Sequence, residues 1–348
     1  MRIFFLYHDR WANNQAEPIL RIKNKLGIDC FSCPSNPGTP EHLWPDFDDS
    51  KRRLELDEIY KKIEKLNPDI IITHTRSLTP YLLRTQIPLI LLEHTDATAL
   101  ELGRHLLDFD NVLSIVKGSV FSNYDFYNSE LYEGMYHGKF INSLNLNKKK
   151  PYKKVTENNY KKILLGYSFG AFPANKRFLH YNANKNKKID ISFVGNTFYY
   201  RSKLISNHRS LAVKELSKIK NTVYENNVNQ KKYDEIMLES LSCLSPYGYG
   251  VCYRSFESIY CGCLTIQPYS DFMVTWPNVF VKDHSYLECC PNFSNINMIL
   301  EFIKDNYIKL INKIYEKREE LFNCYFNDEI LSEYIYNNII LKSINNQK

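Results

Sequence analysis

Short, nearly uninterrupted hydrophobic runs alternate along the chain with stretches in which apolar residues recur at helical spacing. In the first half, the runs predict β-strands over residues 2–7, 28–33, 68–74, 88–94 and 112–116. The helical spacing predicts helices over residues 17–27, 54–66 and 79–86. Strands that alternate with helices imply right-handed crossovers and a parallel sheet, and uninterrupted apolar strands indicate that both faces of that sheet are covered.

The same alternation restarts in the second half of the chain. Strands are predicted over residues 162–169, 189–195, 221–225, 241–246 and 263–268. Helices are predicted over residues 210–219, 233–240, 256–262 and most of 297–343. The two halves share an architecture without sharing a sequence repeat. The expected fold class is therefore α/β, with two Rossmann-like domains facing a central cleft and C-terminal helices packing back.

A basic, polar stretch over residues 145–162 interrupts this alternation and contains Pro151. We interpret it as the connection between domains. The chain is then divided into an N-terminal domain over 1–150, a C-terminal domain over 160–325 and a C-terminal helix or tail over 326–348. The Lys run of the connection has two interpretations, a solvated linker or a contact with anionic lipid or nucleic acid.

Composition is that of an ordinary globular protein. The chain has 348 residues, of which 44% are hydrophobic and 24% charged, so it can bury about two domain cores. A net charge of +6 is mild for this length. This charge is compatible with phosphorylated ligands. It is too small to indicate a nucleic-acid partner, and we therefore consider such a partner unlikely.

Cysteine usage indicates a reducing compartment, and the hydropathy pattern predicts no membrane span. Of nine cysteines, only Cys30 and Cys33 form a CxxC pair, and no second pair follows at zinc spacing. We expect buried free thiols at Cys261, Cys263, Cys289 and Cys290. The first apolar run is too short for a signal segment, and no window approaches the ~20 apolar residues of a membrane span. We therefore expect a cytoplasmic, soluble enzyme whose membrane contact, if any, is peripheral.

Residues 241–268 combine features that suit a phosphorylated ligand. A predicted strand ends at Ser245, a loop with Gly248 and Gly250 follows, and a helix begins near Arg254. Ligands of open α/β sheets bind at the carboxyl ends of strands, where loop N–H groups and a helix dipole attract phosphate. Arg254 adds a charge-assisted contact to a diphosphate. Glu257, one turn further, has the acceptor-only chemistry that suits ribose hydroxyls.

The aromatic residues of this loop have two interpretations. Tyr247 and Tyr249 alternate with its glycines. Each ring can stack on a donor base, or it can pack within the core or the loop. Both alternatives stay open at the level of the sequence.

This segment resembles the donor-binding segment of GT-B glycosyltransferases, closest to their exostosin-like and CgeB-like branch. The matching positions are Ser245, Pro246, Gly248, Gly250, Arg254, Phe256, Glu257, Gly262 and Pro268, followed by Trp276 and Pro277. Upstream, residues 190–209 resemble the start of the same family's C-terminal domain. There the resemblance implies donor contacts for Gly195, Asn196 and Arg201, with Lys203 as a further cation and Arg209 downstream. The clear resemblance covers about residues 190–290, and the N-terminal half matches in architecture alone.

Two positions depart from the family pattern. Val251 follows Gly250 where a Glu is usual, and Ser255 follows Arg254 where an Asp is usual. In related retaining enzymes that Glu is implied to contact the donor sugar. The departure leaves a second hypothesis open, a catalytically degenerate protein that binds a nucleotide sugar or a glycan. A third is another two-domain α/β enzyme, such as a sugar epimerase or phosphorylase.

The resemblance implies transfer of a sugar from a nucleotide-sugar donor, UDP- or GDP-linked, to a hydroxyl acceptor. The acceptor class it implies is a glycan, glycolipid or glycoprotein bound to the N-terminal domain. Cations and a helix N-terminus can stabilise a diphosphate leaving group, so we expect no metal and no further cofactor.

Polar residues that end the N-terminal strands are candidates for the general base. Asp96 and His94 follow the fourth strand after Glu93, and Asp9 follows the first strand after His8. For each, capping or packing is the alternative interpretation. His74, which ends the third strand, more plausibly packs. The DxD of Asp46 and Asp48 lies in a Pro-rich loop, so we interpret it as a solvated turn and not as a metal site.

Overall fold

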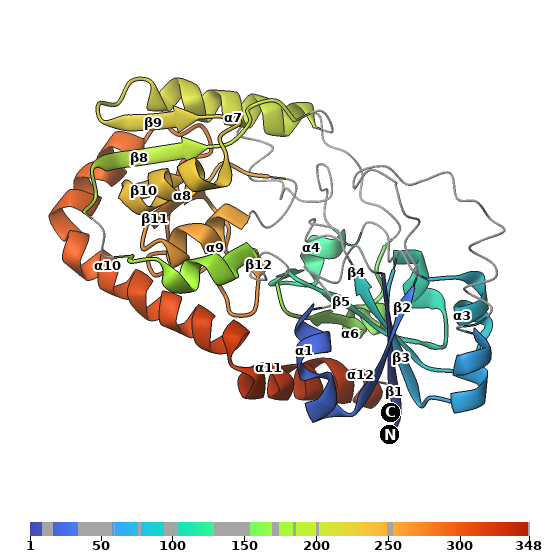
Figure 1. The fold of residues 1–348 in the computed structure, drawn as a ribbon. Coiled ribbons are helices and arrows are strands. Elements are labelled where there is room, and N and C mark those ends of the chain that lie inside the picture. The colour runs from blue at the N-terminus through green and yellow to red at the C-terminus, as the bar shows by residue number, and fades with distance from the viewer. Residues whose placement is uncertain are drawn as a thin grey trace.

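The protein folds into two α/β domains joined by long C-terminal helices (Figure 1). The computed structural model describes residues 1–8, 17–33, 58, 60–75, 78–93, 100, 104–128, 154–168, 174–183, 186–199, 202–248 and 253–346. Within them the expected fold class, two Rossmann-like domains, is confirmed by two separate parallel sheets. The segments after β1, β2 and β4 and residues 249–252 lie outside the described residues.

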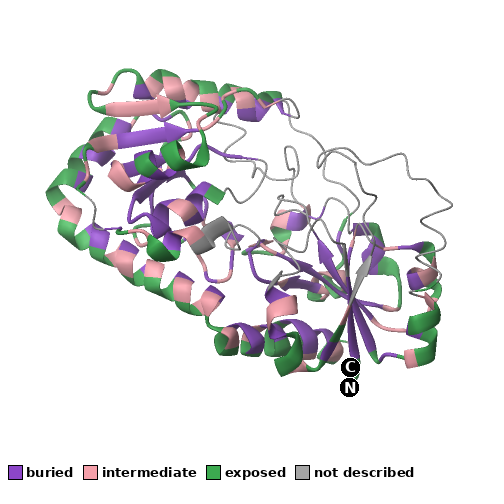
Figure 2. Cartoon of the chain, viewed as in Figure 1, coloured by how far each residue is buried: buried purple, intermediate pink, exposed green. Residues whose placement is uncertain are grey.

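The N-terminal sheet has the order β2-β1-β3-β4-β5-β7, and its described pairs are parallel. Its strands are β1 (Ile3–His8), β2 (Ile28–Cys33), β3 (Ile70–His74), β4 (Leu89–Glu93), β5 (Val112–Lys117) and β7 (Ile163–Leu165). The helical segments are α1 (Glu17–Leu26), residues 60–66, α3 (Pro80–Arg84), η3 (Arg104–Asp108), α4 (Asp125–Asn128) and α6 (Glu157–Lys161). The inner strands β3, β4 and β5 are mostly apolar and are buried along their whole length, as their hydrophobic runs predict (Figure 2).

One strand belongs to a different domain than the sequence predicts. The run beginning at Lys162 is expected to open the C-terminal domain, but β7 pairs with β5 at the edge of the N-terminal sheet. Ile115 faces Ile163, and Lys117 faces Leu165 in this register. The basic stretch before it is therefore not the point at which the first sheet ends. An apolar run specifies a strand but not the sheet that the strand joins.

The C-terminal sheet has the order β13-β11-β10-β8-β9 and is also parallel. Its strands are β8 (Ile189–Val194), β9 (Thr222–Glu225), β10 (Ser240–Leu244), β11 (Leu264–Pro268) and β13 (Tyr286–Cys289). The associated helices are η5 (Ala174–His180), α7 (Lys203–Leu216), α8 (Gln230–Glu239) and α9 (Tyr253–Tyr260). α7 begins seven residues before the helix predicted from Ser210, because Ser202 caps it by accepting a hydrogen bond from the Ile205 amide.

The C-terminal helices pack back on the N-terminal domain, as expected. α10 (Ile296–Phe326) runs along the C-terminal domain and bends at Asn306, where the backbone is non-helical. The helical segment then continues as α11 (Asp328–Tyr334), η6 (Ile335–Leu341) and α12 (Lys342–Asn345) below the N-terminal sheet (Figure 1). A two-stranded antiparallel ribbon also joins the domains, with β6 (Val120–Phe121) pairing with β12 (Met273–Val274).

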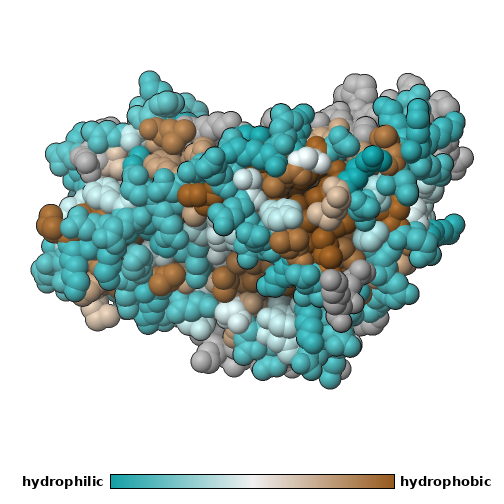
Figure 3. Space-filling model, turned by 90° about the horizontal axis from the view of Figure 1, so that it is seen from below, coloured by the Kyte–Doolittle hydropathy of each residue, from teal (hydrophilic) through white to brown (hydrophobic). Residues whose placement is uncertain are grey.

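On the face seen from below, hydrophilic residues predominate and hydrophobic residues gather in separate patches (Figure 3). In the described part of the chain, no helix is long and apolar enough to span a bilayer. Cys261, Cys263 and Cys289 are buried free thiols, as expected. The same expectation is wrong for Cys290, which is exposed because it lies just beyond the end of β13.

Candidate functional site

The C-terminal sheet reverses its direction of winding between two adjacent strands. From β8 the chain crosses to β9 on one side, whereas from β10 it crosses to β11 on the other side. With right-handed crossovers, α7 and α9 therefore leave on opposite faces of the sheet. The loops after β8 and β10 separate at this point, which is where open α/β sheets bind ligands. The strands β8 and β9 direct these carboxyl ends toward the side that holds the N-terminal domain (Figure 1).

Arg254 connects α9 to the end of β8 at this switch point. It lies in the first turn of α9, is 7% exposed, and its Nη2 donates to the Val194 carbonyl at 2.5 Å. Its guanidinium lies over the Phe193 ring at 4.9 Å. Gly195 follows Val194, and an added Cβ at Gly195 would lie 2.6 Å from the same Nη2. Glycine at this position therefore allows a buried cation to approach the backbone at the end of β8.

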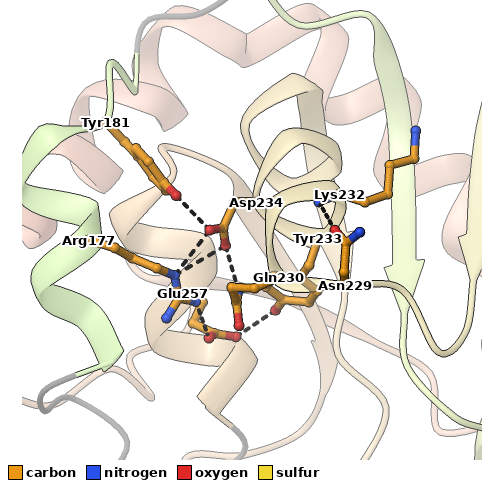
Figure 4. Close-up of polar contacts among 8 residues, drawn as sticks. All are labelled: Arg177, Tyr181, Asn229, Gln230, Lys232, Tyr233, Asp234 and Glu257. Carbon is orange, nitrogen blue, oxygen red and sulfur yellow. Dashed lines mark hydrogen bonds and ion pairs between the residues drawn. The ribbon is translucent and has the colours of Figure 1, made fainter.

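Glu257 lies one turn further along α9 and is held by two donors (Figure 4). Arg177 Nη2 donates to its Oε1 at 2.9 Å, and the Tyr233 hydroxyl donates to its Oε2 at 2.6 Å. Burial, with the adjacent Glu257 charge, raises the pKa of Tyr233 well above its usual value, so the phenol stays a donor at neutral pH. The Glu257 side chain is 15% exposed and therefore remains within reach of a ligand.

Asp234, on α8, extends this network away from the switch point. It accepts from Arg177 Nε at 3.2 Å, from Tyr181 Oη at 2.6 Å and from Gln230 Nε2 at 2.8 Å. Burial and the hydrogen bond to Asp234 raise the pKa of Tyr181 to about 12. Arg177 thus lies between two carboxylates, and Figure 4 shows it entering from η5 on one side of the cluster.

The other predicted donor-site residues divide into three groups. Asn196 lies in the loop after β8, where its Oδ1 accepts from the Phe198 amide at 2.8 Å, and Lys203 is the exposed first residue of α7. Tyr247 is buried, stacks on His208 at 5.4 Å and donates to the Tyr269 carbonyl, so the packing alternative describes it. Gly248 is buried beside it. Arg201, Tyr249 and Gly250 lie outside the described residues.

The departure at Ser255 has a structural explanation. Ser255 is buried, and its hydroxyl donates to the Gln267 side-chain oxygen of β11 at 3.2 Å. The serine hydroxyl therefore takes part in the contact between α9 and β11. The second departure, Val251, lies outside the described residues.

The candidate bases Asp96, His94 and Asp9 also lie outside the described residues, as do the side chain of His8 and the DxD of Asp46 and Asp48. His74 is fully buried, with its ring 5.8 Å from that of Phe5, in keeping with its interpretation as a packed residue. Glu93 is buried too, and Lys117 Nζ lies 3.2 Å from its Oε2.

Sequence reasoning missed Arg177, Tyr233 and Asp234. Arg177 lies 80 residues before Glu257, so no local spacing links the two. A signal for Asp234 was present, since an acidic residue on the buried side of a helix requires a partner. Among the described residues, no group of three or more His, Cys, Asp or Glu side chains could hold a metal ion.

Comparison with known proteins gives structural neighbours alone, since no family model and no curated protein sequence matches the chain. S. aureus MnaA with UDP is 12% identical with a TM-score of 0.46, covering 100% of this chain and 97% of that one. Anabaena HepE in complex with UDP is 9% identical with a TM-score of 0.49, covering 96% and 98%. A glycosyltransferase from Rickettsia africae is 13% identical with a TM-score of 0.46, covering 97% and 99%. At these values, function must be inferred from the chain's own residues.

Proposed function

We propose that this protein is a glycosyltransferase of GT-B type, in the exostosin-like or CgeB-like branch, that moves a sugar from a nucleotide-sugar donor to a hydroxyl acceptor. The observation that carries the proposal is the contact of Arg254 with Val194, which joins the start of α9 to the end of β8 at the switch point of the C-terminal sheet. This contact supports the proposal, because open α/β sheets bind ligands at such switch points.

The charges at this edge suit a diphosphate leaving group. Arg254 supplies a cation that is largely shielded from water, where its field acts more strongly than at an exposed position. Both α7 and α9 begin at this edge, and the positive ends of their dipoles add to the charge there. Lys203 at the start of α7 adds an exposed charge. These groups stabilise a diphosphate through protein charges and dipoles.

Glu257 suits the ribose of the donor. Each of its oxygens accepts one protein hydrogen bond, and a carboxylate oxygen can accept a second. Since Tyr247 is occupied in the core, Tyr249 remains the candidate for stacking on the base.

The acceptor, a glycan, glycolipid or glycoprotein, binds the N-terminal domain in this proposal. There Asp96 is the leading candidate for the base that takes the proton from the acceptor hydroxyl, with His94 and Asp9 as the others. Asp96→Asn is expected to leave donor affinity unchanged and to lower turnover. Unchanged turnover would remove Asp96 as the base.

A thermal-shift screen against UDP, GDP, ADP, dTDP and CMP with their common sugars tests the donor class. A specific ligand at about 100 times its dissociation constant should stabilise the fold by roughly 2.7 kcal/mol. No stabilisation by any nucleotide would contradict the proposal. Binding without transfer to any acceptor would favour the degenerate binding protein, and donor epimerisation without acceptor would favour the epimerase.

Arg254→Ala tests whether the ligand occupies the switch point. We expect donor affinity to fall about tenfold or more, because a buried charge-assisted contact is lost. Arg84→Ala, at an exposed arginine of α3 in the other domain, is the matched control and should bind normally. Equal affinities for the two variants would place the donor elsewhere.

A further inference from the structure

The hydrogen bonds of Glu257 determine where its carboxylate points. Oε1 accepts from Arg177 and Oε2 from Tyr233, so neither oxygen can turn without losing a partner (Figure 4). Both oxygens keep a second acceptor position. Two acceptors at a fixed spacing match two adjacent hydroxyl donors better than a freely rotating carboxylate does.

Arg177 is itself held in place from several sides. Its Nε lies 3.2 and 3.3 Å from the two oxygens of Asp234, and its guanidinium lies 4.2 Å from the Phe178 ring centroid. The segment that carries it is anchored by Arg318 of α10, whose Nη2 donates to the Tyr181 carbonyl at 3.3 Å. Arg177 is therefore a fixed point to which the Glu257 carboxylate is attached.

Arg177 also separates two negative charges. It bridges Asp234 and Glu257, whose side chains are 5% and 15% exposed. Without this cation, two largely buried carboxylates would repel each other, and Glu257 would turn toward solvent. The planar guanidinium can contact both carboxylates at once through Nε and Nη2, which a lysine ammonium cannot reproduce in the same geometry.

We propose that Arg177 is a positioning residue that sets the selectivity of this site for ribonucleotides over 2′-deoxyribonucleotides, by fixing Glu257 to receive the vicinal ribose hydroxyls. Arg177 acts through Glu257 and does not itself contact the nucleotide. This inference rests on the proposed donor site and adds to it a residue from outside the motif.

Binding of UDP against 2′-deoxy-UDP, and of GDP against 2′-deoxy-GDP, measures this selectivity by calorimetry. The wild-type chain should prefer the ribonucleotide by about tenfold, as expected for one hydrogen bond to a charged group. Glu257→Gln should weaken this preference. Arg177→Ala should abolish most of it, while affinity for the deoxynucleotide changes little.

Two variants separate positioning from mere structural support. Arg177→Lys keeps the charge and should keep part of the preference, which guards against misfolding of the alanine variant. Tyr181→Phe removes a different hydrogen bond to Asp234 and should leave the preference unchanged. The inference is overturned if Arg177→Ala and Arg177→Lys lower both affinities equally and the ratio stays at the wild-type value. A wild-type chain that binds the nucleotides without preference overturns it alone, whereas one that binds none overturns the proposed donor site as well.

Discussion

At the scale of single residues, the proposed site depends on side chains that have both a structural contact and a proposed contact with the ligand. Arg254 supports the end of β8 through the Val194 carbonyl and supplies charge to the proposed donor site. Glu257 joins α8 to α9 and presents acceptor oxygens to a ligand. Substitutions here therefore affect stability and binding together.

Gly195→Ala tests the close approach at the switch point. The new Cβ would lie 2.6 Å from Arg254 Nη2, so the guanidinium must move off the Val194 carbonyl. We expect a stability loss of about 1–2 kcal/mol, typical of overpacking, and a clear loss of nucleotide affinity in calorimetry.

Gly27→Ala is the matched control for that loss of affinity. Its φ of 62° strains an alanine, but nothing lies within 4 Å of the new Cβ and the residue ends α1 in the other domain. It should lose stability without losing affinity. If Gly195→Ala bound nucleotide as well as this control does, the loop after β8 would not belong to the donor site.

His208 predicts a specific pH dependence of stability. Its ring lies between Tyr247 and Phe293 under the loop that follows β10, and its Nε2 lies 2.9 Å from the Pro291 carbonyl. Burial, with a smaller contribution from the Arg209 charge, lowers its pKa to about 4. The folded state therefore binds this proton less readily than the unfolded state, so the stability present above pH 6.5 is lost progressively as the pH falls toward 4.

Urea unfolding at pH 7 and pH 4 measures this contribution against His208→Gln, which does not titrate. The wild-type chain should lose about 3 kcal/mol more than the variant between the two pH values, an order-of-magnitude figure from the change in pKa. Parallel losses in both proteins would mean that His208 can be protonated without leaving its site.

At the scale of elements, helix ends in the C-terminal domain are held by basic side chains. Lys187 Nζ donates to the Leu238 carbonyl at 3.0 Å and to the Cys261 carbonyl at 3.1 Å. These carbonyls end α8 and α9, where unpaired oxygens and the negative dipole end favour a cation. One lysine thus fixes the relative position of the two helices that carry Asp234 and Glu257.

Lys187→Met removes both hydrogen bonds and keeps most of the aliphatic stem. We expect the free energy of unfolding to fall by about 1–2 kcal/mol in urea titrations. Lys188→Met is the control, since that side chain is 62% exposed and its ion pair with Glu239 at 3.5 Å should contribute close to nothing. Equal effects at the two positions would contradict the capping role of Lys187.

The elements themselves could largely be predicted from local pattern. β3 (Ile70–His74) forms within the run predicted over residues 68–74, because a nearly uninterrupted apolar run between two helices is typical of a buried strand in an α/β chain. The sheet to which β7 belongs could not be predicted, because that depends on which sheet offers it a free edge, β5 in the first sheet or β9 and β13 in the second. The short ribbon of β6 and β12 has two residues in each strand, too few to form a pattern.

The candidate site was predictable only as far as it is local in sequence. Arg254 and Glu257 lie one turn apart on the same helix, just after the glycine-containing loop, so their spacing in the sequence already brings them together. Arg177 lies in η5, which comes between β7 and β8 in the sequence, and only the tertiary fold brings it to Glu257. Tyr247 shows the opposite limit, since sequence cannot determine whether an aromatic ring in a loop faces ligand or core.

At the scale of the whole molecule, the C-terminal helices hold the two domains together. α10 follows the C-terminal domain, whereas α11, η6 and α12 belong to the core of the N-terminal domain. Arg21 of α1 forms an ion pair with Asp328 at 2.5 Å, and the Tyr334 hydroxyl donates to the Leu165 carbonyl of β7 at 3.0 Å. Residues 328–345 therefore contribute to the packing of the N-terminal domain.

This packing predicts that a disruptive substitution in η6 destabilises the N-terminal domain more than the C-terminal domain. Ile339 is 1% exposed and lies close to Gly166, just after β7. Ile339→Asp buries an uncompensated carboxylate there, which should destabilise the N-terminal domain by several kcal/mol. Tyr336→Asp places the same charge on the same helical segment at a side chain that is 38% exposed, and should change stability little.

Hydrogen exchange followed by mass spectrometry distinguishes the domains in the Ile339→Asp chain. Amides of β1, β3, β4 and β5 should lose protection, while those of β8, β10 and β11 keep it, because the second sheet is hydrogen-bonded separately from the first and has its own helices. Equal loss in both sheets would mean that α10 and the ribbon couple the domains into one cooperative unit. In that case nucleotide binding to the C-terminal domain would also protect the amides of the N-terminal sheet, which the same measurement with ligand present would detect.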